Sequence, residues 1–429
     1  MSTIIVFIVF AICILIAIPI STSLGIVSIL PSIIEPSFTA SGQFIVRSMV
    51  SGLDSFPLLA VPMFILSGVI MARGGISEKI FNVFVYFFGK VKSGIPCAVI
   101  ITCLFYGAIS GSGPATVAAV GSMTIPILVN LGYDKTFATA IVATAGGLGV
   151  IIPPSIPYIM FGMSSGESVS KLFLAGIIPG IVVALLLMIY AFYYCSKHGE
   201  DREKINCEVS KLRRKGLISV LREGFWALLT PVIILGCIYS GIASPTEAAV
   251  ISVFYALFVS LFAYKTIKVK DIWSILVDST KTFAPILFIL GASVAFSRVL
   301  TLMQVPQIIS DWILGNISNK IVLLIVINLF LLLVGMVMDT TPAILILTPI
   351  LLPITTSVGI DPIHFGIVMV VNLAIGFITP PIGINLFVAS SLVDIPVYEI
   401  AKCVLLLIGY FIIALLLISF IPSISLCLL

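Results

Sequence analysis

Long uninterrupted runs of apolar residues alternate along the chain with short polar turns and with a second kind of apolar segment that contains Gly, Pro, Ser and Thr. A helix needs about 20 apolar residues to cross the hydrocarbon core of a bilayer. The uninterrupted runs therefore predict ordinary membrane spans. These runs cover residues 3–30, 57–72, 172–195, 225–243, 247–264, 283–300 and 403–422.

Four further apolar segments are interrupted by small and polar residues and predict a different geometry. They cover 94–130, 136–165, 322–353 and 364–393. In the first, the limbs 98–109 and 115–126 are each about 12 residues long, or about 18 Å as helix, whereas the hydrocarbon core is about 30 Å thick. Neither limb can cross alone, so we expect a re-entrant helical hairpin with its tip at Ser110–Pro114.

The second interrupted segment predicts one full span that is broken in its middle. Its two parts, 136–147 and 156–165, together have the length of one span and flank a break at Gly146–Ser155. The same pair of elements recurs later, as a hairpin with its tip at Asp339–Pro342 and a span broken at Gly376–Gly383. The predicted fold class is therefore an all-α polytopic membrane protein with two hairpins and two broken helices.

Composition and charge agree with this assignment, and the positions of the charged residues indicate which ends of the spans face the cytoplasm. Of the 429 residues, 60% are hydrophobic and 9% charged, too few charges for a water-facing exterior. The one long polar stretch, 197–223, is rich in Lys and Arg, which makes it cytoplasmic by the positive-inside rule. Threading outward from it places 18 of the 22 Lys and Arg on the cytoplasmic side. The exceptions are Arg47, Lys171, Arg298 and Lys320.

The two units of hairpin and broken helix repeat each other in sequence. Pro153-Pro154 precedes Pro380-Pro381 by 227 positions, and Gly149 precedes Gly376 by the same offset. The threading opens the first hairpin to the cytoplasm and the second to the outside, so the repeats are inverted, as in many secondary transporters. We expect an N-terminal span with an outer segment, repeat 1, scaffold spans with the cytoplasmic loop 196–224, repeat 2 and a C-terminal span. These segments cover 1–56, 57–171, 172–282, 283–395 and 396–429.

The chemistry is expected at the tips and breaks. An unpaired peptide group in hydrocarbon costs several kcal/mol, so irregular backbone there must be satisfied by protein, water or an ion. Carbonyls at half-helix C-termini, glycines that allow close approach and Ser or Thr hydroxyls suit a small hard cation, and we predict one sodium site in each repeat. The candidate residues are Gly107, Ser110, Ser112, Gly149, Ile152 and Ser155 in repeat 1, and Gly335, Thr340, Gly376, Thr379 and Ile382 in repeat 2.

Half-helix N-termini present N–H groups and suit a carboxylate, so we expect an anionic substrate between the two tips. The candidate substrate ligands are Arg47, Thr116, Pro154, Thr341, Pro381 and Asn385.

Two other polar residues have more than one interpretation. Asp339 could attract a cation or cap a half-helix, and Arg298 could bind a ligand, snorkel or pair with Asp311. Ser244–Glu247 indicates a capping box.

Catalysis is not indicated. Neither His198 nor His364 has a second histidine three or four residues away, and no Walker loop or catalytic carboxylate pair is present. The cysteines show no metal-ligand spacing and mostly lie in or beside apolar runs, as small hydrophobic residues do. We therefore expect no enzyme and no cofactor, with sodium ions as coupling ions only.

The N-terminus indicates an uncleaved first span because it lacks a basic region and a cleavage site.

Five motifs resemble those of the large membrane subunit of TRAP (tripartite ATP-independent periplasmic) transporters, and the resemblance covers nearly the whole chain. The motifs are GAISGSGPATVAAVGSMTIPIL, GGLGVIIPPSIPYIMFG, SPTEAAV, MDTTPAILILTPILLP and GFITPPIGINLF. The resemblance implies sodium-driven import of an organic acid, such as sialic acid or a C4-dicarboxylate, by an elevator mechanism in the bacterial inner membrane.

The same resemblance implies two protein partners, a small membrane subunit and a periplasmic substrate-binding protein. Because no further spans precede Met1, we expect the small subunit on a separate chain. The small net charge of +4 gives no indication of nucleic-acid binding.

Two alternatives remain open. One is a self-sufficient sodium/dicarboxylate carrier of the related elevator fold, although such carriers usually have Ser-Asn-Thr at both tips. The other is a channel or a membrane scaffold that transports nothing.

Overall fold

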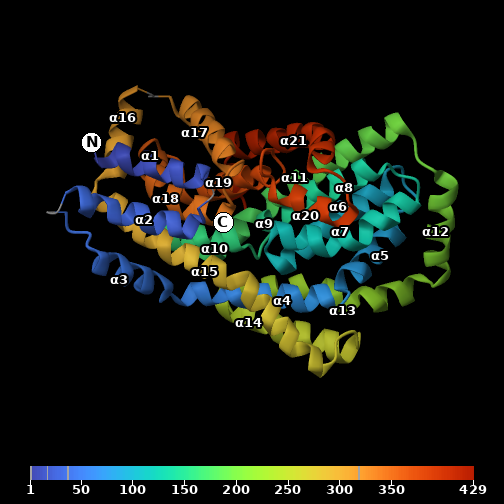
Figure 1. Cartoon of the computed structure of the whole chain (residues 1–429). Helices are drawn as coiled ribbons and strands as arrows, with labels where there is room; N and C mark the ends of the chain where they lie inside the picture. The colour runs from blue at the N-terminus through green and yellow to red at the C-terminus, as the bar shows by residue number, and fades with distance from the viewer. Residues whose placement is uncertain (1, 17, 36–37, 317–318) are drawn as a thin grey trace.

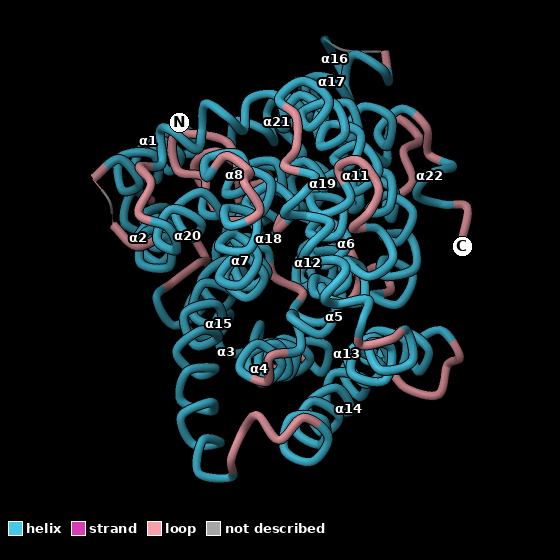
Figure 2. The backbone as a smooth tube through the Cα atoms, turned by 90° about the vertical axis from the view of Figure 1, so that its right-hand side faces the viewer, coloured by secondary structure: helices cyan, strands magenta, loops and turns pink. Residues whose placement is uncertain are grey.

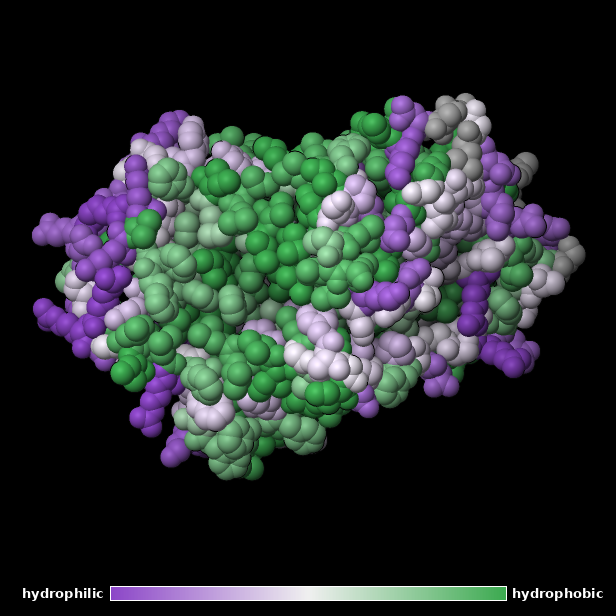
Figure 3. Space-filling model, turned by 180° about the vertical axis from the view of Figure 1, so that it is seen from behind, coloured by the Kyte–Doolittle hydropathy of each residue, from purple (hydrophilic) through white to green (hydrophobic). Residues whose placement is uncertain are grey.

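The computed structural model describes residues 2–16, 18–35, 38–316 and 319–429, and within these ranges every regular element is helical (Figure 1). Nine helical segments of the described chain are long and apolar enough to cross a membrane. In Figure 3 a hydrophobic band occupies the middle of the molecule, and hydrophilic side chains gather at its two ends. A polytopic membrane protein requires this distribution, because the band contacts lipid and the ends contact water.

The first apolar run forms two helices instead of one. Helix α1 (Ser2–Leu15) ends before Pro19, and α2 (Ile20–Ile34) begins directly after it. Pro19 has a ψ angle of 136°, which no helical residue adopts, so it separates the two helices. Each is about 22 Å long, less than the hydrocarbon core, and the two pack against each other. The prediction of one continuous span over 3–30 is therefore wrong.

A first group of helices, here called the scaffold group, lies on one side of the molecule. It contains α3 (Gly42–Leu53), α4 (Ala60–Arg73), α13 (Leu217–Tyr239), α14 (Pro245–Phe258) and α15 (Ile272–Leu302). Helices α3 and α4, joined by the short helix η1 (Phe56–Leu59), both pack along α15, and α4 also packs on α14. The 3-10 turn η3 (Val269–Asp271) precedes α15, and the π turn η2 (Val259–Ala263) ends α14. The predicted capping box Ser244–Glu247 is confirmed at the start of α14.

The second group, here called the bundle, contains both hairpins and both broken helices, and Figure 2 shows α8, α11, α19 and α21 on the side opposite α4, α13 and α14. Repeat 1 consists of α6 (Gly94–Ser110), α7 (Gly113–Asn130), α8 (Lys135–Ala145), α9 (Leu148–Ile151) and α10 (Ile156–Ser165). Repeat 2 consists of α17 (Lys320–Gly335), α18 (Thr340–Ser357), α19 (Pro362–Gly376) and α20 (Ile384–Val393). The predicted hairpins and breaks are present at the predicted places. The predicted limbs 98–109 and 115–126 are too short, however: α6 has 17 residues and α7 has 18, and α7 is long enough by itself to cross a membrane.

The span after repeat 1 lies in the bundle and not among the scaffold spans with which the sequence grouped it. Helix α11 (Val169–His198) packs on α6, α9, α10 and α19, and on the C-terminal span α21 (Val397–Phe420). Its small residues Ala175, Gly176 and Gly180 allow this close packing: a Cβ at Gly176 would lie 2.6 Å from the Tyr158 ring. The short helices α16 (Val305–Asn316) and α22 (Ser423–Leu426) cover the bundle at its edges.

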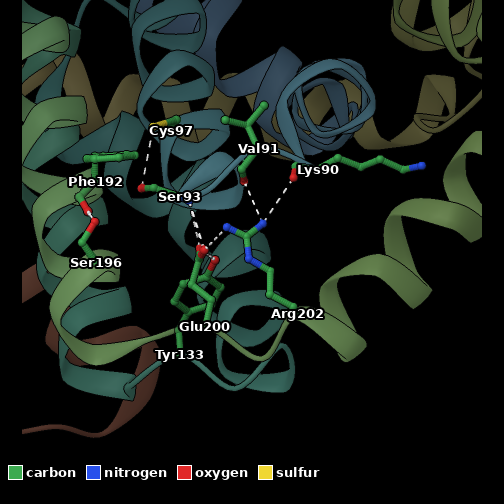
Figure 4. Close-up of polar contacts among 9 residues, drawn as sticks. All are labelled: Lys90, Val91, Ser93, Cys97, Tyr133, Phe192, Ser196, Glu200 and Arg202. Atoms are coloured by element: carbon green, nitrogen blue, oxygen red, sulfur yellow. Dashed lines mark hydrogen bonds and ion pairs between the residues drawn. The ribbon is translucent and has the colours of Figure 1, made fainter.

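Two elements connect the groups at the basic end of the molecule. Helix α5 (Ile76–Phe88) packs on both α6 and α13, and α12 (Arg202–Arg214) packs on α5. The turn between α11 and α12 is held by Glu200, whose side chain is 2% exposed. Its carboxylate accepts hydrogen bonds from Tyr133 Oη at 2.6 Å and Ser93 N at 3.1 Å, and it pairs with Arg202 at 2.7 Å (Figure 4).

This arrangement makes Glu200 a buried acceptor on which three parts of the chain converge. Burial and the hydrogen bond to Glu200 raise the pKa of Tyr133, which therefore remains a neutral donor. Arg202 also donates to the carbonyls of Lys90 and Val91, at 3.2 and 3.3 Å. The turn before α12 is thereby fixed to the base of the first hairpin.

The burial of Glu200 generates a stability prediction. Glu200→Ala leaves the Tyr133 hydroxyl and the Ser93 N–H without their acceptor and should lower the free energy of unfolding by about 1–3 kcal/mol. Glu208→Ala is the matched control, because Glu208 forms an exposed ion pair with Lys211 on the same helix, worth about 0.5 kcal/mol or less. Thermal unfolding in detergent measures both changes. Equal shifts for the two variants would contradict this assignment.

Candidate functional site

The tip of the first hairpin is formed by a glycine in the left-handed conformation. Helix α6 ends at Ser110, Gly111 has a φ angle of 62°, and α7 begins at Gly113 with Pro114 in its first turn. Proline suits that position because the first helical N–H groups have no intrahelical acceptor. The Gly111 carbonyl accepts from Ile156 N at 3.4 Å, which joins the tip to the break of the neighbouring helix.

The break in repeat 1 is built from Gly146, one isolated helical turn and a Pro-Pro dipeptide. Ile152 is extended, with a ψ angle of 131°, and the Pro153-Pro154 bond is cis. Ser155 then caps α10: its Oγ accepts from Tyr158 N and donates to the Val150 carbonyl. Every residue from Gly146 to Ser155 is buried.

Tip and break meet through two glycines in repeat 1. A Cβ at Gly107 would lie 2.7 Å from Gly149 Cα, and a Cβ at Gly149 would lie 2.7 Å from the Ser112 carbonyl oxygen. Real Cβ atoms do not approach so closely, so only glycine fits at either position. The hydroxyls of Ser110 and Thr116 lie 3.0 Å apart, and Thr116 Oγ1 donates to Ser112 O at 2.8 Å. The predicted residues Gly107, Ser110, Ser112 and Gly149 therefore lie together.

The second repeat forms the same contact. A Cβ at Gly335 would lie 3.3 Å from Gly376 Cα, and a Cβ at Gly376 would collide with the Gly335 carbonyl. The hydroxyl of Thr379 donates to the Ile375 carbonyl at 2.7 Å, and Asp339 caps α18 by accepting from Thr340 N at 2.6 Å. The capping interpretation of Asp339 is thus the one that its contacts support.

The second break differs from the first in its exposure. Pro381 and Ile382 are exposed, with Ile382 40% accessible, whereas Pro154 and Ile152 are buried. The Pro380-Pro381 bond is cis, and Gly383 has a φ angle of 53° before α20 begins. Ile382 therefore lies at the surface of the break, while the rest of the predicted second set lies at or beside the glycine contact.

Asn385 connects the two repeats. It is fully buried at the start of α20, its backbone N–H donates to the Phe377 carbonyl at 2.9 Å, and its Nδ2 donates to the Ala143 carbonyl in α8 at 3.0 Å. A Cβ at Gly113, the first residue of α7, would lie 3.3 Å from Asn385 Oδ1, which has no hydrogen-bond partner in the structure. An unpartnered buried oxygen beside a helix N-terminus is a polar position that a ligand or water can satisfy.

A cavity of about 670 Å³, the inner cavity, extends from the first tip to the basic end of the molecule. Ser110, Ser112 and Pro114 line its inner part, and Arg73 and Thr282 line its mouth. Arg73 forms an ion pair with Asp278 and donates to Ser274 Oγ at 2.7 Å. The cavity separates α4 and α15 of the scaffold group from the first hairpin, and its size suits a small organic molecule.

A second cavity of about 640 Å³, the outer cavity, lies along the same boundary toward the opposite end. Glu167, Arg298 and Thr246 line it, and Arg298 donates to Ser51 Oγ at 2.8 Å. Arg47, predicted as a substrate ligand, is exposed on α3 and lines neither cavity. The structure therefore does not bring Arg47 together with the other candidates, whereas Thr116 and Thr341 are buried beside their respective tips.

Sequence reasoning missed a buried polar ladder in repeat 2. Asn372 Nδ2 donates to Asn328 Oδ1 at 2.8 Å, and Asn328 Nδ2 donates to Ser419 Oγ at 3.2 Å. The ring of His364 continues the ladder, 3.3 Å from the Ser419 carbonyl and 3.2 Å from Ser425 Oγ. The signal was present, because an Asn inside an apolar helix is rare unless it has a role. This ladder holds α17 to α19 along the same interface as the Gly335–Gly376 contact.

The inverted repeats, the paired broken elements and the cavities between two helix groups define a membrane transport protein. The family described as tripartite ATP-independent periplasmic transporter, DctM component, matches residues 7–424. The chain therefore belongs to the DctM family of TRAP transporter large permease subunits, and the predicted resemblance is confirmed.

Two relatives and one solved structure illustrate the similarity. The isethionate TRAP transporter permease protein DctMQ of Oleidesulfovibrio alaskensis is 41% identical over 415 residues, which are 97% of this chain and only 64% of that longer protein. The C4-dicarboxylate TRAP transporter large permease protein DctM of Pseudomonas aeruginosa is 38% identical over 375 residues, 87% of this chain and 86% of that protein. The YdaH transporter of Alcanivorax borkumensis has a TM-score of 0.58 over 90% of each chain at 17% identity, which shows a shared fold.

The glycine contact of repeat 2 generates a packing prediction. Gly376→Ala places a methyl group against the Gly335 carbonyl and should destabilise the protein by about 1–3 kcal/mol. Gly409→Ala is the matched control in helix α21, where a Cβ meets nothing within 4 Å, and it should be neutral or stabilise by up to about 1 kcal/mol. Thermal unfolding in detergent reports both. If Gly376→Ala behaved like the control, the close contact would be refuted.

Proposed function

We propose that this chain is a sodium-coupled importer of an organic acid, with one sodium site at the contact between tip and break in each repeat. The observation that carries the proposal is the matched pair of glycine contacts, Gly107 with Gly149 and Gly335 with Gly376. In both, a helix end and a helix break face each other with no side chain between them. Their carbonyl oxygens are the groups that a desolvated cation can use.

The donor set favours a monovalent hard cation. Backbone carbonyls and the hydroxyls of Ser110 and Thr379 are neutral oxygens, which suit hard cations and supply little charge. The described residues contain no cluster of three His, Cys, Asp or Glu side chains. Neutral oxygens at both sites therefore support sodium over a divalent ion that needs several carboxylates.

The substrate position that we propose lies between the tips, beside the N-terminus of α7. Helix N-termini attract anions, and the inner cavity reaches Ser112 and Pro114 at this N-terminus. Asn385 Oδ1, an acceptor beside Gly113, would bind a hydroxyl or N–H group of the substrate and not its anionic group. Thr116 lies one turn into α7, with its hydroxyl donating to the Ser112 carbonyl. Pro154, Thr341 and Pro381 complete the candidate set predicted from the sequence. Arg73, which pairs with Asp278, lines the inner cavity on the proposed route to the cytoplasm, whereas Arg47 lines neither cavity.

The substrate class that we propose is an organic acid with at least one fully ionised group. The relatives above are named for isethionate and for C4-dicarboxylates, which share an anionic head and differ in the rest of the molecule. A C4-dicarboxylate and sialic acid both fit the class. Because helix N–H groups bind the anionic head that these acids share, we propose that the periplasmic binding protein supplies the selectivity among them.

The movement that we propose is an elevator step, in which the bundle slides against the scaffold group. The inner and outer cavities lie along the boundary between these groups at opposite ends, so a sliding bundle could expose the tips to each side in turn. Sodium bound at both contacts would hold tips and breaks together and remove the repulsion between converging carbonyls and an anion.

The partners and location that we propose follow from the family. They are a small membrane subunit, a periplasmic substrate-binding protein and the bacterial inner membrane. The small subunit is proposed as a separate chain, although the longer relative named DctMQ carries additional length in one chain. A self-sufficient carrier is the alternative: uptake into proteoliposomes without any binding protein would favour it.

Sodium affinity tests this proposal. Thr379→Val removes one hydroxyl oxygen at nearly constant volume and should raise the half-saturating sodium concentration by about 5- to 150-fold, equivalent to about 1–3 kcal/mol. Thr356→Val is the control, because Thr356 also bonds carbonyls of the preceding turn but is exposed at the end of α18. Sodium-dependent thermal stabilisation gives both affinities. If transport requires both ions, the uptake rate should depend on sodium with a Hill coefficient above one. An uptake rate that is hyperbolic in sodium, or equal stabilisation by potassium, would reject the proposal.

A further inference from the structure

A third cavity, here called the α12 cavity, lies at the basic end of the molecule, between α12 and the bases of α5, α6 and α7. Its volume is about 560 Å³. The wall on the side of the transmembrane helices is apolar and is formed by Phe81, Val85, Ile95 and Leu131, each less than a tenth exposed. An apolar recess of this size suits the hydrocarbon part of an amphiphile.

Lysines of α12 form the opposite rim of this cavity. Lys204, Lys211 and Lys215 line it and are all exposed. Lys204 pairs with Asp201 at 3.1 Å, and Lys211 pairs with Glu208 at 2.6 Å. In each pair the acid precedes the lysine by one helical turn. Exposed pairs of this kind are worth about 0.3–0.5 kcal/mol, so a phosphate can compete for the lysines. Lys215 forms no ion pair within the described residues.

The position of the α12 cavity fits the membrane interface. Ile205 and Val209 are buried on one face of α12, and Glu203, Lys204, Glu208, Lys211 and Arg214 of that helix are exposed, as in a helix that lies along a membrane surface. The basic residues place this end on the cytoplasmic side by the positive-inside rule. The inner leaflet carries the anionic lipids, and basic pockets between helices on that side bind their head groups.

We propose that the α12 cavity binds an anionic phospholipid of the cytoplasmic leaflet. The phosphate lies at Lys204, Lys211 and Lys215, and an acyl chain lies along the wall of Phe81, Val85, Ile95 and Leu131. A free phosphate ion would use the lysines but would not contact this wall. A zwitterionic lipid such as phosphatidylcholine brings a cationic amine along with its phosphate, and the three lysines repel that amine. The combination of both surfaces in one recess therefore selects an anionic lipid.

A lipid at this place would contact the base of the first hairpin and the two connecting helices, α5 and α12. Helix α12 connects α11 of the bundle to α13 of the scaffold group, and α5 packs on both α6 and α13. The occupancy of the cavity should therefore affect the rate of transport. Only this consequence rests on the function proposed above, whereas lipid binding itself does not.

Cys207 provides the test, because it is a free, exposed cysteine that lines the α12 cavity. The purified full chain is placed in nanodiscs of phosphatidylcholine alone or with phosphatidylglycerol, and maleimide labelling of each cysteine is followed by peptide mass spectrometry. Phosphatidylglycerol should slow labelling of Cys207 at least about fivefold, as expected when the bound fraction dominates. Cys427, which is also free and exposed but lies outside the cavity, should label at an unchanged rate.

Matched lysine variants separate a site from a general charge effect. Lys204→Gln, Lys211→Gln and Lys215→Gln together should abolish the protection of Cys207. The same charge change at the exposed lysines Lys197, Lys270 and Lys281, which do not line the cavity, should leave it intact. Equal slowing of Cys207 and Cys427, or protection that survives the first triple variant, would overturn the proposal. Protection by inorganic phosphate in phosphatidylcholine discs would also overturn it and indicate an ion site instead. No outcome depends on sodium coupling.

Discussion

Unpaired backbone in the middle of a membrane protein is the constraint on which the rest of this structure depends. Both hairpins and both broken helices end near mid-span, where carbonyls and N–H groups lack helical partners and hydrocarbon cannot satisfy them. The chain brings each tip against its break through a pair of glycines, so that backbone meets backbone without an intervening side chain. Burial of these elements inside the bundle, behind α11 and α21, follows from the same requirement.

The two repeats satisfy this constraint differently. The first break is buried throughout, and serine and threonine hydroxyls bond the carbonyls of its tip. The second break is partly exposed at Pro381 and Ile382, and its hairpin limb α17 is held to α19 by the ladder from Asn372 and Asn328. At the matching positions repeat 1 has Ile100 and Ala145, which cannot form such bonds. The polar ladder therefore adds hydrogen bonds in the repeat whose break is less buried, and the two proposed ion sites should differ in affinity.

Much of the fold could be predicted from sequence because small residues and prolines mark both hairpin tips, and Pro-Pro dipeptides mark both breaks. The hairpins and broken helices were therefore predicted correctly, although the limbs α6 and α7 have 17 and 18 residues where about 12 were expected. The division of the first run at Pro19 was missed, because one proline in an apolar run is compatible with a kinked span as well as with two helices. The placement of α11 in the bundle was also missed, since small residues indicate close packing without identifying the neighbour.

Prediction of the site had a similar limit. Sequence could identify Gly107, Gly149, Gly335 and Gly376 through the repeat, and the structure brings each pair into contact. Arg47 was selected for its charge, but the charge of a residue does not show which way its side chain points. In the structure Arg47 is exposed on α3 of the scaffold group, while Arg73 lines the inner cavity. The ladder of Asn328 and Asn372 depends on contacts between distant helices, which composition and spacing do not encode.

The stoichiometry of sodium binding tests the central claim most directly. Equilibrium binding of radiolabelled sodium to the purified, monodisperse protein should saturate at two ions per chain. Gly107→Val and Gly335→Val each place a side chain at one contact between tip and break, so each variant should retain one ion, and their combination none. Saturation at two ions in both single variants, or the absence of saturable binding in the unmodified chain, would contradict the assignment of one cation site to each repeat.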